Sequence, residues 1–124
     1  MTLLLHPNQR QRKWFRLLLL ITLGIFSLLL FGNPDYPQPV ANTDKWAHLF
    51  GFASLALLLH LAFRWPFWLH LTTLALYAGL VEVIQSFLPY RYADPMDWAA
   101  DMLGALLMLT TLEVMKRRWQ PQQS

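Results

Sequence analysis

Four apolar runs divide the chain, and short polar segments separate them. The runs cover residues 14–31, 46–63, 67–88 and 96–115. Each approaches the roughly 20 residues that a helix needs to cross a ~30 Å hydrocarbon core. Proline follows each of the first three runs within a few residues, so none of them continues into the next as a single helix. The pattern predicts an all-α fold, a four-helix transmembrane bundle with short loops, and a single domain over residues 1–124.

The composition supports a membrane location for these runs. The chain is 56% hydrophobic and only 14% charged, whereas an average soluble domain carries about 25% charged residues. A soluble chain of 124 residues would have too small a core to bury so much apolar surface. The first run exceeds the apolar length of a signal peptide, so we interpret it as an uncleaved membrane anchor. The chain has no cysteine, which excludes disulfides and thiolate chemistry.

Charged residues are distributed unequally between the two predicted sides of the membrane. With four crossings, the N-terminus, the second loop and the C-terminus share one side, which holds eight basic residues and one acid, Glu113. The opposite side holds six acids against Lys45 and Arg91. Short loops rich in Lys and Arg remain in the cytoplasm. We therefore expect both termini to be cytoplasmic and the acidic side to be external. Because the basic residues form no stripe interleaved with aromatic residues, nucleic acid is not an expected partner.

Three runs carry polar residues at the predicted external level. These residues are Asp44 just before the second run and His48 within it, Glu82 and Gln85 in the third run, and Asp97 and Asp101 in the fourth. Asp44 and His48, like Asp97 and Asp101, are four residues apart and therefore share a helix face. Glu82 lies six residues before the end of its run, roughly 9 Å into the helix at ~1.5 Å per residue. Carboxylates at that depth are costly and mark functional sites by default.

Several of these residues also have simpler interpretations. Asp94 and Pro95 resemble a helix start, with Asp94 as N-cap and Pro95 at the first helical position. Lys45 can extend to the membrane interface, and Gln85 can bond a neighbouring helix. His48 alone would more often be a packing residue than a ligand. Because it lies beside two membrane-embedded acids, a site role and a packing role both remain open for it.

The remaining polar residues carry weaker indications. Arg91 follows the third run and either pairs with an acid or holds a phosphate or carboxylate. His60 and His70 lie five residues on either side of Trp65, near the predicted cytoplasmic surface. We expect both histidines at the membrane interface and assign them no site role.

Three segments resemble the VanZ-like membrane family. Residues 44–52, DKWAHLFGF, resemble its D-K-x-x-H-x-x-x-F opening, and residues 82–91 are similar to its E-x-x-Q…R segment. Residues 97–104, DWAADMLG, resemble its D-x-x-x-N-x-x-G segment, with Asp101 in place of the usual Asn. The resemblance covers residues 44–115. The family is named for an accessory protein of glycopeptide resistance, so the resemblance implies a role in the cell envelope.

These observations lead to a functional hypothesis. We expect a bacterial inner-membrane protein with an outward-facing polar pocket that binds or modifies a lipid-linked or peptidoglycan-related anionic substrate and affects glycopeptide sensitivity. An acid/base pair would act on the substrate, cations and an amide would hold it, and further acids would orient these groups. His48 and Glu82 are assigned as the acid/base pair. Lys45, Gln85 and Arg91 are assigned to hold the substrate, and Asp44, Asp97 and Asp101 to orient these groups.

Other hypotheses remain open on the sequence alone. The chain could instead be a non-catalytic accessory or chaperone subunit whose polar cluster fixes its own bundle or docks a partner, so enzymatic activity is undecided. A transporter is less favoured, because four short helices leave little room for alternating access. No cofactor is assigned, and a divalent ion is a lesser alternative, since imidazole and carboxylates are suitable ligands. Expected partners are membrane lipid, an envelope precursor, and either a second copy or another membrane protein.

Overall fold

The protein is described by a computed structural model that covers residues 2–32, 43–89 and 94–119. Over these ranges the chain is helical and contains no strand. The helices are α1 (Thr2–Leu5), α2 (Gln9–Phe31), α3 (Thr43–Ala62), α4 (Phe67–Ser86) and α5 (Pro95–Arg118). In the described ranges four of them, α2 to α5, are long and apolar enough to cross a membrane. The predicted all-α fold with four spans is confirmed, and the chain is a multi-pass membrane protein.

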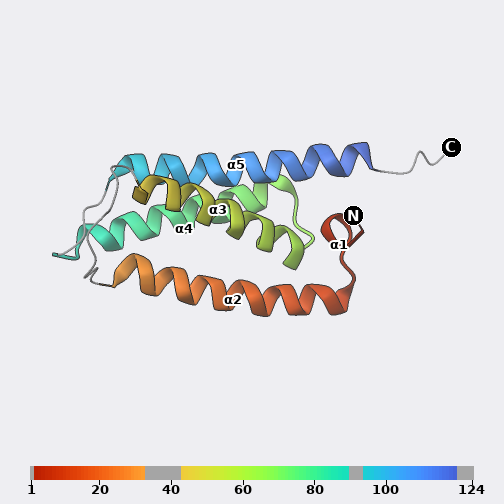
Figure 1. Cartoon of the computed structure of the whole chain (residues 1–124), viewed down its shortest axis with the longest axis horizontal. Helices are drawn as coiled ribbons and strands as arrows, with labels where there is room; N and C mark the ends of the chain where they lie inside the picture. Colours follow the sequence, from red (N-terminus) through yellow and green to blue (C-terminus); the bar gives the residue numbers. More distant parts are fainter. Residues whose placement is uncertain (1, 33–42, 90–93, 120–124) are drawn as a thin grey trace.

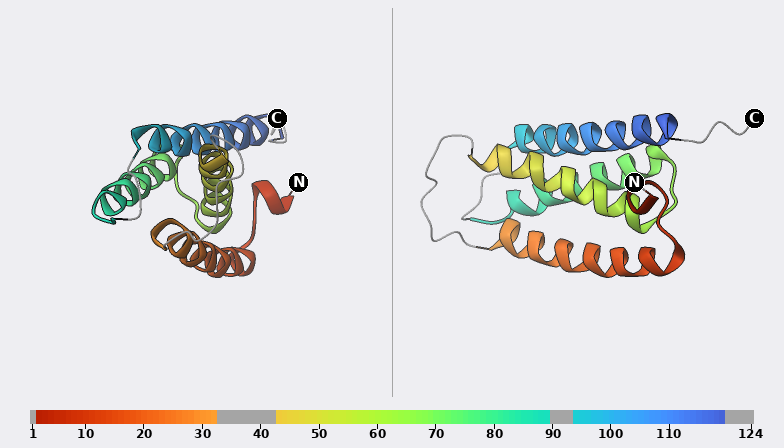
Figure 2. Two further views of the ribbon diagram at one scale, coloured as in Figure 1. Left: turned by 60° about the vertical axis from the view of Figure 1, so that its left-hand side comes forward. Right: turned by 45° about the vertical axis from the view of Figure 1, so that its right-hand side comes forward.

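The four long helices lie side by side with their axes roughly aligned (Figure 1). The interface between α3 and α5 is the most extensive, followed by those of α2 with α3 and of α4 with α5. Seen from two further sides, α2 and α5 lie on opposite sides of the bundle, with α3 and α4 between them (Figure 2). Two of the three helices that carry the predicted polar residues, α3 and α5, are therefore direct neighbours.

Local sequence explains where α2 and α5 begin. The Asn8 side chain accepts a hydrogen bond from the Gln11 backbone, and the Gln11 side chain accepts one from the Asn8 backbone. This capping box starts α2 five residues before the first apolar run, because capping does not require apolar residues. At α5, the Asp94 side chain accepts from the Met96 N–H and Pro95 occupies the first turn. The predicted cap of the fourth span is confirmed.

The bundle has a narrow core and a wide apolar exterior. Leu55, Ala56 and Leu59 of α3 pack with Ala105 and Leu109 of α5 in the centre. Large apolar side chains of all four long helices point outward and are exposed; examples are Leu28, Phe50, Leu76 and Leu107. In water this surface would be strongly unfavourable, whereas in hydrocarbon it is solvated by lipid tails. At ~1.5 Å per residue these helices are ~30–36 Å long, which suits the ~30 Å core of a bilayer.

A glycine sets the spacing between α3 and α5. A Cβ atom built at Gly104 would overlap the carbonyl oxygen of Leu49 and lie 2.9 Å from its carbonyl carbon. The two backbones thus touch directly, as membrane helices do where small residues face each other. His48 immediately precedes Leu49, and Asp101 lies one turn before Gly104. The close approach therefore brings the polar residues of α3 and α5 within bonding reach.

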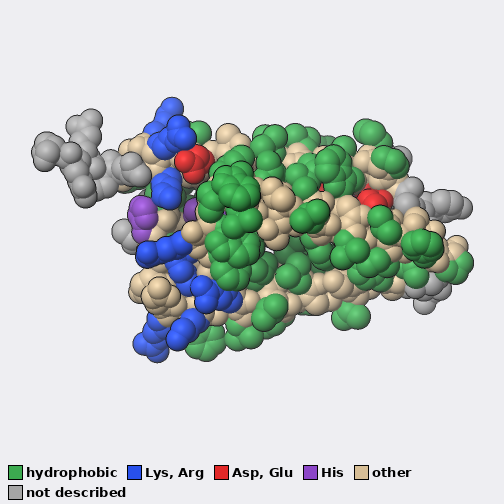
Figure 3. Space-filling view, turned by 180° about the vertical axis from the view of Figure 1, so that it is seen from behind, with side chains coloured by type: hydrophobic (Ala, Val, Ile, Leu, Met, Phe, Trp, Pro, Cys, Tyr) green, Lys and Arg blue, Asp and Glu red, His purple; other side chains and the backbone are tan. Residues whose placement is uncertain are grey.

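Charges separate to opposite ends of the bundle. The start of α2, the turn between α3 and α4 and the end of α5 form one end of the bundle, which we call the basic end. We call the opposite end the acidic end. The space-filling view shows Lys and Arg side chains gathered over the basic end (Figure 3). The described acids lie at the acidic end, except for Glu113. The described basic and acidic residues thus lie mainly at opposite ends of the bundle, as the sequence predicts.

The orientation of the bundle is the first testable prediction. We expect a reporter fused after Ser124 to give a cytoplasmic signal and one inserted within residues 36–42 to give an external signal. The physical reason is the retention of Lys and Arg in short cytoplasmic loops. Paired alkaline phosphatase and fluorescent-protein fusions measure this directly. A cytoplasmic signal from residues 36–42 would contradict the orientation.

Candidate functional site

The central contact of the acidic end joins His48 of α3 to Asp101 of α5. Nδ1 of His48 lies 2.7 Å from Oδ1 of Asp101. The Asp101 side chain is fully buried, and that of His48 is 10% exposed. A carboxylate can only accept, so the proton of this bond resides on Nδ1 of the imidazole. Nε2 is then the basic nitrogen, and it lies 3.8 Å from Oδ2 of Asp97, beyond hydrogen-bonding distance.

Lys45 connects the start of α3 to the start of α5. Its Nζ lies 3.0 Å from Oδ2 of Asp94 and 3.6 Å from Oδ1 of Asp97. The Met96 N–H and the Lys45 ammonium hold the pKa of the Asp94 carboxyl below its usual value. A carboxyl with a lowered pKa is ionised at neutral pH, and its stabilising contribution is lost only as the pH falls through that lowered pKa. The cap of α5 and its link to Lys45 are therefore intact at neutral pH.

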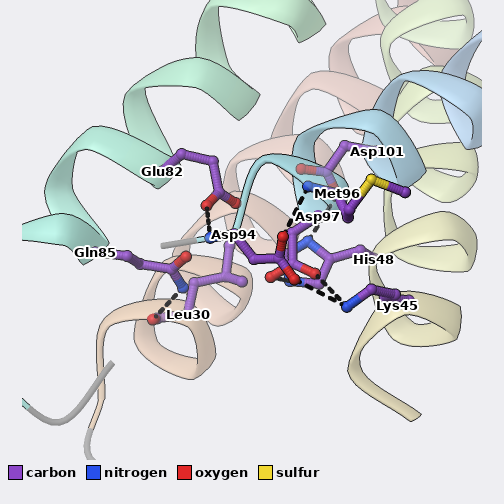
Figure 4. A network of polar contacts seen from close by, with 9 residues as sticks. All are labelled: Leu30, Lys45, His48, Glu82, Gln85, Asp94, Met96, Asp97 and Asp101. Carbon is purple, nitrogen blue, oxygen red and sulfur yellow. Dashed lines mark hydrogen bonds and ion pairs between the residues drawn. The ribbon is translucent and has the colours of Figure 1, made fainter. Parts of the chain in front are cut away.

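Glu82 brings α4 into the same network. Its Oε2 accepts a hydrogen bond of 3.0 Å from the backbone N–H of Asp94. Its Oε1 is buried and has no hydrogen-bond partner among residues 2–32, 43–89 and 94–119. Figure 4 shows the side chains of Glu82, Asp97, Asp101, His48 and Lys45 converging from α3, α4 and α5 around Asp94. A buried carboxylate oxygen without a partner is costly, so it marks a position where a ligand or water would be favourable.

Gln85 has a different contact. Its Nε2 donates a hydrogen bond of 2.9 Å to the backbone carbonyl of Leu30, near the end of α2. This bond attaches α2 to α4 at the acidic end (Figure 4). Gln85 thus bonds a neighbouring helix, which is the simpler of the two roles expected for it from the sequence.

Two of the predicted residues cannot be placed in this network. Arg91 lies outside the described residues. Asp44 belongs to the first turn of α3, but its side chain also lies outside what the structure describes. The other six predicted residues are Lys45, His48, Glu82, Gln85, Asp97 and Asp101. All six lie at the acidic end, and all except Gln85 belong to the network around Asp94. We call this network, with Asp94 included, the acidic-end cluster.

The arrangement is suited to proton transfer. Asp101 fixes the tautomer and orientation of His48, as an acid partner does for a basic imidazole in many hydrolytic sites. Nε2 of His48 and Oε1 of Glu82 are then available to a bound molecule, and the buried Oδ2 of Asp101 likewise has no hydrogen-bond partner among the described residues. No described hydrogen bond joins His48 to Glu82; the two are linked through Asp94, Lys45 and Asp97. Over the described ranges, no group of three or more His, Asp and Glu side chains is placed to hold a metal ion.

The part played by Asp94 goes beyond the capping role that the sequence predicts. Its side chain binds Lys45 and its backbone binds Glu82, so one residue links three helices. The signal for this role in the sequence is that Asp94 lies three residues before Asp97, so that both residues stand at the start of the same helix. Nothing in that spacing identifies Lys45 and Glu82 as its partners.

Known proteins resemble this chain over most of its length. The profile of the VanZ/LLP1 family matches residues 2–116. A relative in the fission yeast Schizosaccharomyces pombe, the uncharacterized protein C11E3.10, is 38% identical over 112 residues. The match covers 82% of this chain and 65% of the yeast protein, so the chain spans slightly less than two thirds of that relative. No solved structure matches the chain.

Proposed function

Because the chain belongs to the VanZ/LLP1 family, we propose that it is a protein of the cell envelope whose acidic-end cluster binds the headgroup of a lipid-linked anionic substrate. A peptidoglycan precursor is one member of that substrate class. In this proposal the chain lies in the bacterial inner membrane with both termini in the cytoplasm, so that the cluster faces the external side. The charge separation between the two ends of the bundle supports this orientation.

One observation carries the proposal. At the acidic end, a buried His48–Asp101 pair with a contact of 2.7 Å lies in the same network as the unpartnered Oε1 of Glu82. An unmade hydrogen bond of a buried carboxylate oxygen costs about 1–3 kcal/mol, so a molecule that donates a hydrogen bond to Oε1 of Glu82 would be stabilised there. The vacant acceptor therefore favours a bound molecule that donates a hydrogen bond to Glu82.

The charges of the cluster define the substrate further. Lys45 is already held between Asp94 and Asp97, so its charge is largely balanced. We assign the anionic group of the substrate chiefly to Arg91, whose guanidinium suits phosphate and carboxylate geometry. The carboxylates of Glu82 and Asp97 would then meet hydroxyl or amino groups of the same headgroup. This combination fits a phosphate-linked sugar or peptide better than a bare phosphate.

A proton-transfer step is consistent with this binding mode. Nε2 of His48 would accept a proton from a substrate hydroxyl or amine, and Asp101 would stabilise the resulting imidazolium. Glu82 would hold or return a proton on the opposite side of the substrate. The same residues would also serve a binding protein without chemistry, because a histidine that accepts a hydrogen bond needs no reaction to follow.

A second candidate function is a non-catalytic accessory subunit. It is favoured by the fact that Lys45, His48, Asp94 and Asp101 all have partners within the bundle. In that case the network fixes the relative positions of α3, α4 and α5, and the surface of the bundle docks a partner membrane protein. The two functions differ in what Glu82 must do, and a single substitution separates them.

Glu82→Gln is expected to keep the fold and remove the function. The glutamine carbonyl can still accept the Asp94 N–H, while the ionisable oxygen is lost. We expect unchanged membrane abundance and melting temperature, together with a loss of about tenfold or more in the protective effect in an envelope-stress or glycopeptide-sensitivity assay, since removing a general acid or base typically costs 10²–10⁴ in rate.

The matched control is Ser86→Ala, one turn further along α4. The Ser86 side chain is exposed, and its hydroxyl bonds only the Val83 carbonyl of its own helix in the described part of the chain. It should behave as wild type in the same assays. Wild-type protection by Glu82→Gln at normal abundance would refute the substrate site, and reduced abundance with normal specific protection would favour the accessory subunit.

A further inference from the structure

A second polar region lies at the basic end, about one helix length from the acidic-end cluster. There a partly open cavity of about 470 Å³ is lined by α1, the start of α2, the turn between α3 and α4, and the end of α5. Its polar lining combines three cations, Arg12, Arg64 and Lys116, with the imidazoles of His6, His60 and His70. The remainder is mainly aromatic and aliphatic. The cavity thus has a positive polar part and an apolar part.

Two of the polar lining residues are almost completely buried and have unused hydrogen-bonding atoms. The His70 residue is 2% exposed, and neither of its ring nitrogens has a hydrogen-bond partner among the described residues. Arg12 is 7% exposed; its Nη1 reaches the Leu61 carbonyl at 3.4 Å, while its buried Nε has no such partner there. Buried donors of this kind are costly when they remain unsatisfied. Both residues therefore indicate a ligand that accepts hydrogen bonds.

The fold holds these groups in place before any ligand is present. Arg12 and Arg16 of α2 reach the carbonyls of Leu61 and Ala62 at the end of α3. The guanidinium of Arg16 also stacks over the Phe63 ring, 4.8 Å from its centroid. His60 Nε2 lies 3.2 Å from the Leu4 carbonyl, so α1 is attached beside the cavity. Of the residues that line the cavity, Arg12 and His60 are thus positioned by backbone carbonyls before a ligand binds, which lowers the entropic cost of binding.

The start of α4 adds a further positive contribution. His70 and Phe67 both belong to its first turn, and both line the cavity. Pro66 precedes the helix and provides no side-chain cap. The first N–H groups of a helix carry a partial positive charge that attracts anions. Among the described residues, the lining contains one carboxylate, Glu113, which is paired with Arg117 at 3.3 Å.

We propose that this basic-end cavity binds a phosphate-bearing anion. The apolar part of the lining, with Phe63, Trp65 and Leu109, would contact the adjoining hydrocarbon if the phosphate belongs to a lipid. Basic pockets between membrane helices at the cytoplasmic surface are suited to anionic headgroups. The phosphate could come from an anionic phospholipid or from the free ion, and the two sources give different results in the experiment below. The inference is independent of the acidic-end cluster.

The experiment follows the thermal unfolding of the full chain in neutral detergent by its tryptophan fluorescence. Three ligands are titrated: phosphatidylglycerol in mixed micelles, phosphatidylcholine in the same micelles, and inorganic phosphate against chloride at equal ionic strength. A lipid site gives a saturable rise in Tm with phosphatidylglycerol well above that with phosphatidylcholine and none with phosphate. A site for the free ion gives the rise with phosphate. A chain that binds its ligand only when folded must show such a shift.

Two double variants test whether the cavity is responsible. Arg64→Gln with Lys116→Gln removes two lining charges, and Arg10→Gln with Arg118→Gln removes two charges of the same end that do not line the cavity. We expect the first pair to raise the half-saturating ligand concentration roughly tenfold or more, because each charge-assisted hydrogen bond is strong. The second pair should leave it within about twofold, since Arg10 and Arg118 do not line the cavity and act on a bound anion only through solvent and salt.

His70→Phe provides an independent check that keeps the net charge and the packing of the ring. It should abolish most of the Tm shift while leaving the Tm without ligand close to that of wild type or higher. No saturable shift with either phosphatidylglycerol or phosphate would overturn the proposal, and so would equal losses in the two double variants.

Discussion

Replacing His48 with alanine is expected to lower the free energy of unfolding by about 3–5 kcal/mol. The substitution leaves the Asp101 carboxylate fully buried without the imidazole that lies 2.7 Å away in the wild type. Removing one partner of a buried pair is costly because the remaining charge has neither water nor a counter-charge. The measurement is reversible unfolding in detergent micelles, followed by tryptophan fluorescence. Asp101→Asn is the conservative comparison and should keep the fold, because the amide oxygen can still accept from Nδ1.

A double-mutant cycle separates the pair from its surroundings. His48→Leu and Asp101→Ala should each destabilise, whereas the double variant removes both polar groups and approximately conserves the combined volume. We therefore expect the double variant to be more stable than the sum of the single effects by roughly 0.5–3 kcal/mol. Additive effects, or a loss of less than about 1 kcal/mol in His48→Ala, would mean that the pair is not buried as described.

Gly104→Ala is expected to have the other large effect. The added methyl group would overlap the carbonyl oxygen of Leu49 and crowd its carbonyl carbon, and both atoms belong to backbone that cannot rotate away. Overpacking typically costs about 1–3 kcal/mol, and a backbone contact places this substitution at the upper end of that range. The helices α3 and α5 must separate, so His48 and Asp101 should lose their bond and function should fall with stability.

Gly24→Ala is the matched control for this prediction. A Cβ atom at Gly24 meets nothing within 4 Å, so only the helix propensity changes. Alanine is favoured over glycine in a helix by about 1 kcal/mol, and the control should therefore be neutral or slightly stabilising. Equal Tm values for Gly104→Ala and Gly24→Ala would show that α3 and α5 do not pack as closely as the structure places them.

The fold is largely predictable because it depends on the length and polarity of segments. Each of the four apolar runs of about 20 residues must form a helix in a bilayer, because the hydrocarbon core offers no partner for unpaired backbone groups. Asp94 and Pro95 indicate the start of α5 for an equally local reason. The apolar pattern does not predict the start of α2 at Gln9, because its first turn is polar and is fixed by the Asn8–Gln11 capping box. Nor does it predict the short α1, since four residues carry no usable periodicity.

The acidic-end cluster is predictable only in part. Helical spacing indicates which residues share a face, so the sequence alone places Asp97 and Asp101, for example, on the same side of one helix. Spacing gives no information on how one helix is rotated against the next. The pairing of His48 with Asp101, and of Glu82 with the Asp94 backbone, therefore follows only from the three-dimensional arrangement.

The basic-end cavity shows a different limit of sequence analysis. His60 and His70 bracket the turn of Arg64, Trp65 and Pro66, so they lie at adjoining helix ends. Their positions in the sequence predict a location at the membrane interface and give no indication of a role. Sequence alone cannot reveal that α1 and Arg12 enclose the same space, because those residues are about 50 positions away along the chain. Burial of His70 is thus a property of the assembled bundle.

The contacts of Arg12 and Arg16 with the end of α3 have a consequence for how the protein is assembled in the membrane. The carbonyls of Leu61 and Ala62 are reachable only when α2 is inserted with its N-terminus on the same side as the turn between α3 and α4. A first helix threaded in the opposite direction would present leucines there and could not dock. The contacts of Arg12 and Arg16 therefore couple the packing of α2 to its direction of insertion, because an α2 inserted the other way would remain unpacked.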